Sequence, residues 1–388
     1  RLWNVADPKR AGPLGRPLAA ASGIVYGVEF SPDGEKLLTT SDDGVSRLWS
    51  LPPRVLPAHA DGVAAVAVSP DGTVLASGGA DQAAQLWRIT AGKRPVPVGK
   101  PLTGARGVVG HVDFSPSGDL LAVGSDDVTV RLWRVADPAH PEPVGKPLPG
   151  SSSYFSPDGT VLVVVAGSVL RIYDVTDPAK PELLRTVETG QATYVTSAAF
   201  SPDGEMLATG GFDRTVMLWD LSDPARPRRV GAALTAHRGP VWAVAFRPDG
   251  HLLATAGGDR TVRLWDVRRP ARPEAVGVPL RGHADAVNSL AFGPRGDRLV
   301  TGSYDKTVRV WSMHDRASTK LPGHTGVIED VAMTPDGRAV SASGDGTVRL
   351  WELDIASSIA RICADTPSVL TEAAWARHIP QRDYDPPC

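Results

Sequence analysis

The eleven residues "GGDRTVRLWDV", Gly257 to Val267, decide the fold because close copies of them recur along the chain. The copies read "GFDRTVMLWDL" at Gly211–Leu221, "SYDKTVRVWSM" at Ser303–Met313 and "SGDGTVRLWEL" at Ser343–Leu353. In each copy an Asp stands six residues before a Trp. A chain that repeats one phrase is built from repeated structural units, and the spacing of the copies indicates which units they are.

The aromatic residues that end the phrase lie 38 to 46 residues apart, a period typical of repeat folds. Three short runs of strand-forming residues precede most of these aromatics, and a fourth run follows. A Pro-Asp-Gly tight turn commonly joins the first two runs. The pattern predicts four-stranded antiparallel units, which bury both faces only when they are stacked in a ring. The aromatics are Trp3, Trp49, Trp87, Trp133, Tyr173, Trp219, Trp265, Trp311 and Trp351.

On these residues the chain resembles the WD-repeat β-propellers, over roughly residues 1–353. The resemblance implies an all-β ring of four-stranded antiparallel blades. We expect eight blades, with an N-terminal strand in Ala11–Leu18 closing the ring and removing two open edges. The alternative is seven blades, with residues 1–50 left over from a neighbouring propeller.

The resemblance also implies a hydrogen-bonded tetrad of His, Ser or Thr, Asp and Trp in each regular blade. Three complete sets share gaps of 18, 4 and 6 residues, and a fourth shortens only the first gap. These half-buried polar groups can satisfy one another, so we interpret them as scaffold. Other repeats depart from the set, as with Gln191 in the place of His. The complete sets are His59, Ser77, Asp81 and Trp87; His237, Thr255, Asp259 and Trp265; His283, Thr301, Asp305 and Trp311; and His324, Ser341, Asp345 and Trp351.

Catalysis at these sets is the competing interpretation, because Ser, His and Asp also form hydrolase triads. An active site is a single cleft, however, and does not occur in four copies between strands. The chain has no familiar catalytic, phosphate-binding or zinc-spaced motif, so we expect no enzyme activity, cofactor or metal. Its 41 basic and 43 acidic residues nearly balance, which does not favour nucleic acid or a membrane as partner.

A partner-binding surface is predicted from the aromatic and polar residues that the scaffold does not use. In WD-repeat proteins partners usually bind the top of the ring, at the start of the first strand and just before the tetrad Asp. The residues at these places are Tyr26, Asp42, Asp126, Tyr194, Phe212, Trp242, Asn288, Tyr304 and Glu329. Exposed aromatics ringed by polar groups are typical of interface hot spots. We therefore expect a protein or peptide partner.

Three alternatives to this surface stay open. Trp242 has the parity of a residue wedged between blades. The Arg-rich turns at Asp223–Val230 and Arg268–Glu274 could contact phosphates, although such turns are more often solvated loops. A small-ligand or enzymatic site at the central channel would have to use Glu329, Asp330 and Asn288.

A change of pattern after residue 353 predicts a separate tail over residues 354–388, with apolar residues at helical spacing. The tail resembles the C-terminal cap of actinobacterial WD-repeat proteins, in which the propeller is the sensor or docking part of a signalling protein. The two cysteines, Cys363 and Cys388, are too few for a disulfide framework, which favours a reducing compartment and hence the cytoplasm. They could pair to pin the tail or stay two free thiols. The chain opens inside a repeat, so we expect a fragment of a longer protein, monomeric on its own.

Overall fold

The computed structural model describes residues 2–4, 12–14, 25–30, 36–41, 46–50, 55–59, 61–90 and 95–353. Within those ranges every regular element is a β-strand, as the all-β prediction requires. In the same part of the chain no helix has the length and apolar character needed to cross a bilayer. The predicted helical tail, with Cys363 and Cys388, lies outside the described residues.

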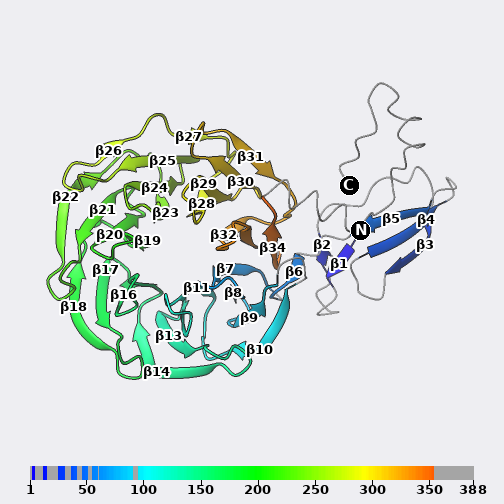
Figure 1. Cartoon of the computed structure of the whole chain (residues 1–388), viewed down its shortest axis with the longest axis horizontal. Helices are drawn as coiled ribbons and strands as arrows, with labels where there is room; N and C mark the ends of the chain where they lie inside the picture. Colours follow the sequence, from blue (N-terminus) through cyan, green and yellow to red (C-terminus); the bar gives the residue numbers. More distant parts are fainter. Residues whose placement is uncertain are drawn as a thin grey trace.

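Seven antiparallel blades form the ring shown in Figure 1. The first strand of each blade packs against the first strands of its neighbours around the axis, and the last strand lies at the rim. Six blades follow one another along the chain: β7 to β10 (Val63–Val68, Val74–Gly79, Ala84–Arg88, Val96–Leu102), β11 to β14 (Val109–Phe114, Leu120–Ser125, Thr129–Arg134, Glu142–Pro149), β15 to β18 (Ser152–Phe155, Val161–Ala166, Val169–Asp174, Glu182–Glu188), β19 to β22 (Val195–Phe200, Met206–Gly211, Val216–Asp220, Arg228–Leu234), β23 to β27 (Val241–Phe246, Leu252–Gly257, Thr261–Asp266, Glu274–Ala275, Leu280–Arg281) and β28 to β31 (Val287–Phe292, Arg298–Ser303, Val308–Ser312, Ser318–Leu321).

The seventh blade closes the ring with strands from both ends of the chain. It contains β32 (Ile328–Met333), β33 (Ala339–Ser343) and β34 (Thr347–Trp351), and its fourth strand is β6 (Val55–Pro57). The expectation of eight blades, closed from Ala11–Leu18, is therefore wrong. The strand β6 already supplies the fourth strand beside β34, and Gly12–Leu14 pairs with β1 instead.

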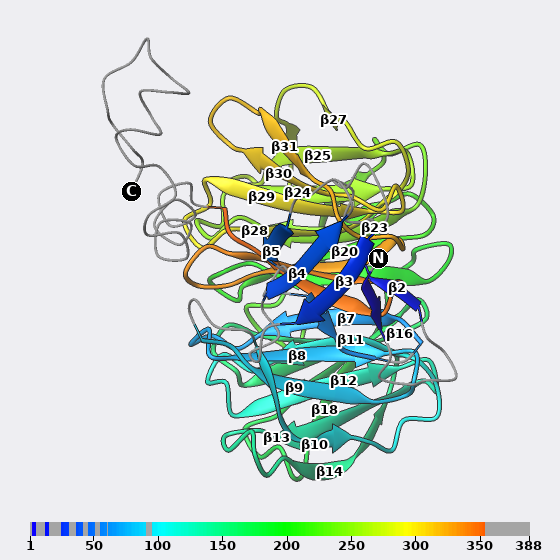
Figure 2. The same ribbon diagram turned by 90° about the vertical axis from the view of Figure 1, so that its right-hand side faces the viewer.

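The N-terminal strands lie outside this ring. One pair joins β1 (Leu2–Asn4) to β2 (Gly12–Leu14). A three-stranded sheet joins β3 (Val25–Phe30), β4 (Lys36–Ser41) and β5 (Ser46–Ser50), and Figures 1 and 2 show it beside the ring. This arrangement agrees with the seven-blade alternative, in which residues 1–50 are not part of the ring.

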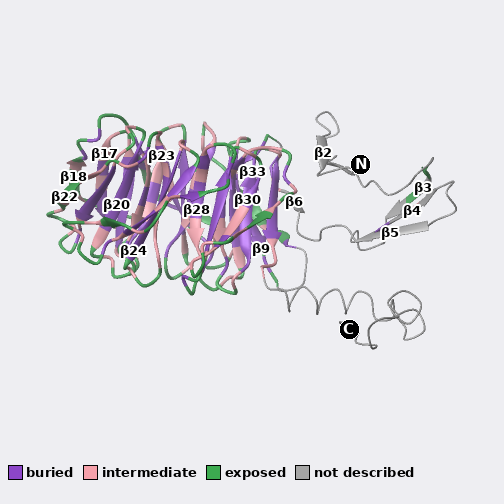
Figure 3. Cartoon of the chain, turned by 90° about the horizontal axis from the view of Figure 1, so that it is seen from above, coloured by how far each residue is buried: buried purple, intermediate pink, exposed green. Residues whose placement is uncertain are grey.

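Apolar side chains of the second and third strands form the core between the blades, and these strands are the buried bands in Figure 3. Leu75, Leu121, Leu207, Leu253 and Leu299 take equivalent places in five second strands, and each is at most 1% exposed. Successive residues of a strand point to opposite faces of the blade, so each blade contributes side chains to the apolar layers on both of its sides. Burial of one such Leu contributes roughly 2 kcal/mol. The ring is thus held by repeated apolar layers.

Four hydrogen-bonded tetrads lock blades at one end of the ring. In each, the imidazole Nε2 lies 2.8 Å from the Ser or Thr hydroxyl, and the Trp indole N–H donates to that hydroxyl at 2.8–3.1 Å. The imidazole Nδ1 lies 2.9–3.1 Å from the Asp carboxylate. The carboxylate can only accept, so the Nδ1–H of a neutral imidazole donates to Asp, and Nε2 accepts the hydroxyl O–H while the hydroxyl oxygen accepts the indole N–H. The four tetrads are the four complete sets of His, Ser or Thr, Asp and Trp that the sequence predicts.

Hydrogen bonds decide the charge of the tetrad carboxylates. Burial alone would raise the pKa of Asp259, but bonds from His237, Thr261 and the Arg238 backbone outweigh it and hold the pKa well below its ordinary value. In the blade of β19 to β22, Gln191 replaces His, and its amide lies 3.3 Å from the Thr215 hydroxyl. Its side-chain oxygen is buried without a hydrogen-bond partner. The polar groups of a complete tetrad are therefore better hydrogen-bonded than those of the blade with Gln191.

We expect Asp259→Ala to cost more stability than Asp213→Ala, which removes the equivalent Asp beside Gln191. The first change leaves a buried imidazole N–H and the Arg238 backbone N–H without their acceptor, a loss of roughly 2–3 kcal/mol. The second removes bonds from the exposed Ala192 backbone and from Thr215, a loss of about 1 kcal/mol. Urea unfolding at pH 7 measures both losses, and equal losses would contradict the tetrad's special contribution.

Candidate interaction surface

The top face of the ring is the end at which the tetrads lie. Here, in four blades, the loop that enters the blade meets the turn between its second and third strands, because the turn's Asp accepts a bond from a backbone N–H of the loop. The predicted partner-binding residues of the ring belong to these loops and to the first strands that follow them. The tetrads thus hold this surface in place without being exposed on it.

Three of the predicted residues, Tyr194, Phe212 and Trp242, form a continuous aromatic cluster that we call the aromatic trio. The rings of Tyr194 and Phe212 are stacked with centroids 5.0 Å apart, and Phe212 meets Trp242 edge-on at 5.7 Å. Tyr194 and Phe212 are 46% and 39% exposed, whereas Trp242 is half-buried. The Phe212 backbone N–H also donates to the Tyr194 carbonyl at 3.1 Å. The trio therefore spans two blades, and Trp242 both packs inward and supports an exposed ring.

A second group contains Asn288, Tyr304 and Glu329. The Asn288 amide donates to the Glu329 backbone carbonyl at 2.7 Å and lies 3.3 Å from its carboxylate. Burial and the neighbouring charge of Asp330 raise the pKa of Glu329. Tyr304 is 37% exposed, and burial, then the charges of Glu329 and Asp285, raises the pKa of its hydroxyl. This group is polar where the trio is apolar.

The remaining predicted residues are not brought together with these groups. Asp126 is exposed on the blade of β11 to β14, and no described contact joins it to the trio. Tyr26 belongs to β3, outside the ring, and Asp42 lies outside the described residues. The structure thus gathers the candidate surface on the blades from β19 to β34.

Comparison with known families agrees with the ring and its tetrads. The family described as "WD domain, G-beta repeat" matches residues 14–50, 51–88, 97–134, 181–220, 228–266, 274–312 and 316–352, well over half of the chain. The chain belongs to the WD40-repeat family. WD40 propellers typically act as protein-interaction scaffolds and are generally not catalytic, which fits a surface of exposed aromatics on this one.

The strands β15 to β17 fall between two matches, and their blade departs furthest from the WD40 tetrad among the three blades without a complete one. Val163 takes the place of the tetrad hydroxyl and is fully buried, and Tyr173 replaces Trp at 6% exposure. Apolar packing therefore substitutes for the polar network here.

Near the axis of the WD40 ring, sequence reasoning missed a polar cluster of His111, Asp113 and Tyr154. The His111 and Tyr154 rings lie 4.8 Å apart, and His111 Nε2 donates to the Ser153 carbonyl at 2.6 Å. Asp113 accepts the Phe155 backbone N–H at 2.9 Å, and burial raises its pKa to about 7. The signal was in the repeats: the position of Asp113 is Ala in five other blades, namely Ala67, Ala199, Ala245, Ala291 and Ala332.

The acidic groups considered for a ligand at the WD40 axis are engaged in holding blades together. Asp330 accepts the Val66 backbone N–H at 3.0 Å and the Ser289 hydroxyl at 2.7 Å, from the two flanking blades. Burial raises the pKa of Asp330 to about 6. Among the described residues no group of His, Cys, Asp and Glu is placed to hold a metal ion. A structural function accounts for Asp330 fully.

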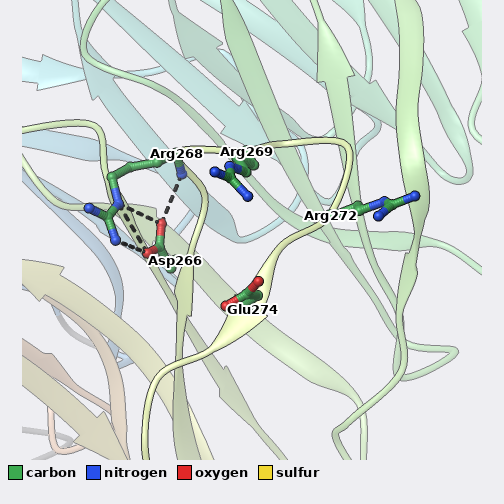
Figure 4. Close-up of a pocket in the computed structure, with 5 residues that line it drawn as sticks. All are labelled: Asp266, Arg268, Arg269, Arg272 and Glu274. Carbon is green, nitrogen blue, oxygen red and sulfur yellow. Dashed lines mark hydrogen bonds and ion pairs between the residues drawn. The ribbon is translucent and has the colours of Figure 1, made fainter.

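The Arg-rich turn of this WD40 protein borders a hollow of about 410 Å³, which Figure 4 shows with its lining residues. Arg268 is turned onto Asp266, with Nε 3.0 Å from the carboxylate, and Arg272 extends away from that pair. Glu274 also lines the hollow. Two acidic side chains thus offset most of the positive charge of the three arginines, so the hollow is a weak candidate for phosphate binding.

Proposed function

We propose that this chain is a non-catalytic interaction module that binds a protein or peptide partner on its top face, at the aromatic trio and Tyr304. The observation that carries the proposal is the contact of the two exposed rings, Tyr194 and Phe212, with Trp242 across two blades. Rigid aromatic side chains lose little conformational entropy on binding and are enriched in interface hot spots.

We further propose that the module is the sensor or docking part of a larger bacterial signalling protein, located in the cytoplasm. The resemblance of the tail to actinobacterial WD-repeat proteins and the low cysteine content support this proposal. As a separate fragment the chain is proposed to be monomeric, and nucleic acid is not the expected partner because the net charge is only −2.

The test is capture of partners from an actinobacterial lysate on the whole chain, compared with the variant Phe212→Ala, Tyr304→Ala. We expect a partner that the double variant binds at least 10-fold more weakly, since truncating one hot-spot residue costs about 1–2 kcal/mol or more. Titration of the purified partner measures the loss.

Leu183→Ala is the matched control, because Leu183 is 49% exposed on the outer strand β18, away from the top face. The control should bind within a factor of about two of the parent chain. Thermal unfolding must show that all variants are folded. Equal retention of every captured protein by the parent and the double variant would refute binding at this face.

A further inference from the structure

The charges around the aromatic trio indicate which chemistry its partner presents. Three arginines, Arg214, Arg238 and Arg260, lie in the same top-face loops as the trio or in the next turn along, and all three are exposed. Within the described residues none of them has a carboxylate within 4 Å. Arg260 instead reaches toward the next blade, where Nη1 lies 3.5 Å from the Ala284 carbonyl. These side chains are available to an incoming acidic group.

The backbone at two of these arginines is strained. Arg214 and Arg260 have φ angles of 73° and 65°, in the left-handed region that glycine occupies at lower cost. The equivalent turn position of the seventh blade is Gly346, with φ 78°. Placing a long cationic side chain there costs roughly 1 kcal/mol relative to glycine. The same turn position is left-handed at Gln82, Val128 and Lys306 of other blades, so this backbone conformation belongs to the repeated turn, which holds each of these side chains at the top face.

The acidic residues of these loops do not neutralise the arginines, because they face inward. Asp259 has a side chain only 10% exposed and accepts bonds from His237, Thr261 and the Arg238 backbone. Asp213 accepts bonds from the Ala192 and Thr215 backbones and from the Thr215 hydroxyl. The outer layer of the surface around the trio is therefore cationic.

The geometry favours a peptide over single-stranded nucleic acid. Nucleic-acid platforms present free ring faces on which successive bases stack. Here Tyr194 and Phe212 stack on each other, and Phe212 is also covered on its edge by Trp242. Asp285 and Glu329, farther along the same face, would repel a phosphate backbone. A short acidic segment avoids both problems.

We propose that the aromatic trio binds a peptide segment of a protein partner in which one apolar or aromatic anchor residue is flanked by Asp or Glu. The anchor packs against Tyr194 and Phe212, and the flanking carboxylates pair with Arg214 and Arg238. Such charge-assisted contacts speed association and select partners more than they add affinity. This inference rests on the proposed function and specifies the partner of the same face.

A phage-displayed library of random 12-residue peptides, selected on the whole chain, tests the proposal without presupposing a sequence. We expect the peptides that are enriched on the parent chain, and not on the Phe212→Ala variant, to share an anchor flanked by acidic residues. Peptides of that class should bind the variant Arg214→Glu, Arg238→Glu at least 10-fold more weakly. They should bind the control Arg229→Glu, altered on the outer strand β22, within about twofold.

The failures of the two proposals give different results. Trio-dependent peptides that are basic or uncharged would overturn the acidic-peptide inference and leave top-face binding standing. No enrichment that depends on Phe212 would overturn the acidic-peptide inference, and the capture experiment with Phe212→Ala, Tyr304→Ala would then decide on top-face binding by itself. Trio-dependent binding of the oligonucleotide dT12, with no acidic peptide competing, would replace the peptide by nucleic acid.

Discussion

A chain that begins at Val55 is expected to unfold within about 3 °C of the whole chain, whereas a chain that begins at Ala58 should lose on the order of 3 kcal/mol. The two differ only in β6, the strand that closes the ring. In β6, Val55, Leu56 and Pro57 pair with Arg349, Val348 and Thr347 of β34. Each backbone hydrogen bond contributes about 1 kcal/mol, and losing the strand leaves β34 as an open edge.

Thermal unfolding and size-exclusion chromatography of the two truncated chains measure this difference. For a ring of this size, 3 kcal/mol corresponds to a drop of roughly 5 °C, and the open edge should promote self-association. The Val55 chain is the control, since it lacks β1 to β5 but keeps β6. Unfolding of that control would show that the ring requires the N-terminal strands, as an eight-bladed ring would. Equal stability of both chains would show that β6 does not close the ring.

The strands and tetrads could be predicted from the sequence because both depend on short, regular spacings. A Pro-Asp-Gly turn, alternating apolar residues and an Asp six residues before a Trp place each strand within a residue or two. Strand register places Thr255 two residues from Leu253, which lies opposite Trp265, and His237 and Asp259 reach this pair from the adjoining loop and turn. Local pattern therefore specifies local geometry.

The number of blades could not be predicted in the same way, because the strand that closes the ring could pair with either of two third strands of similar sequence, β5 or β34. The strand β6 pairs with Thr347, Val348 and Arg349 of β34, and the "RLW" that begins at Arg349 recurs as Arg47 to Trp49 in β5. The strand β6 follows β5 directly, yet it pairs with β34, nearly 300 residues away in sequence. The shared "RLW" does not distinguish the two third strands, so the spacing of the repeats alone leaves seven and eight blades open.

The positions of the candidate surface residues in the repeat could be predicted, but the contacts between their side chains could not. Offsets from the tetrad Asp and the first strand identified Tyr194, Phe212 and Trp242 separately. That Phe212 reaches across to Trp242 of the next blade depends on side-chain conformations and on the angle between blades. Asp126 occupies the position in its repeat that Phe212 occupies in another, but it joins no cluster, because its neighbours offer it no aromatic partner.

The substitution Asp113→Asn is expected to stabilise the protein by about 2–4 kcal/mol at pH 8.5 and by only about 1 kcal/mol at pH 4.5. Burial raises the pKa of Asp113 to about 7 from an ordinary value of 3.8, and the Phe155 N–H bond offsets this only in part. Folding therefore favours the neutral acid. The stability contribution of the neutral acid is complete below pH 4 and is lost as the pH rises through 7. Asn keeps the shape and the acceptor for the Phe155 N–H but carries no charge.

The difference between the variant and the parent isolates Asp113 from its neighbours. Burial lowers the pKa of His111 to about 4, so His111 gives the opposite slope between pH 4 and 6.5, but it does so in both proteins and cancels. Burial also raises the pKa of Tyr154, which stays neutral throughout this range. Urea unfolding at four pH values from 4.5 to 8.5 gives the curve, with Asp126→Asn, at an exposed carboxylate, as the control. A gain that does not grow with pH would mean that Asp113 carries its charge in the folded ring at no cost, and that the ring axis is far wetter than its burial indicates.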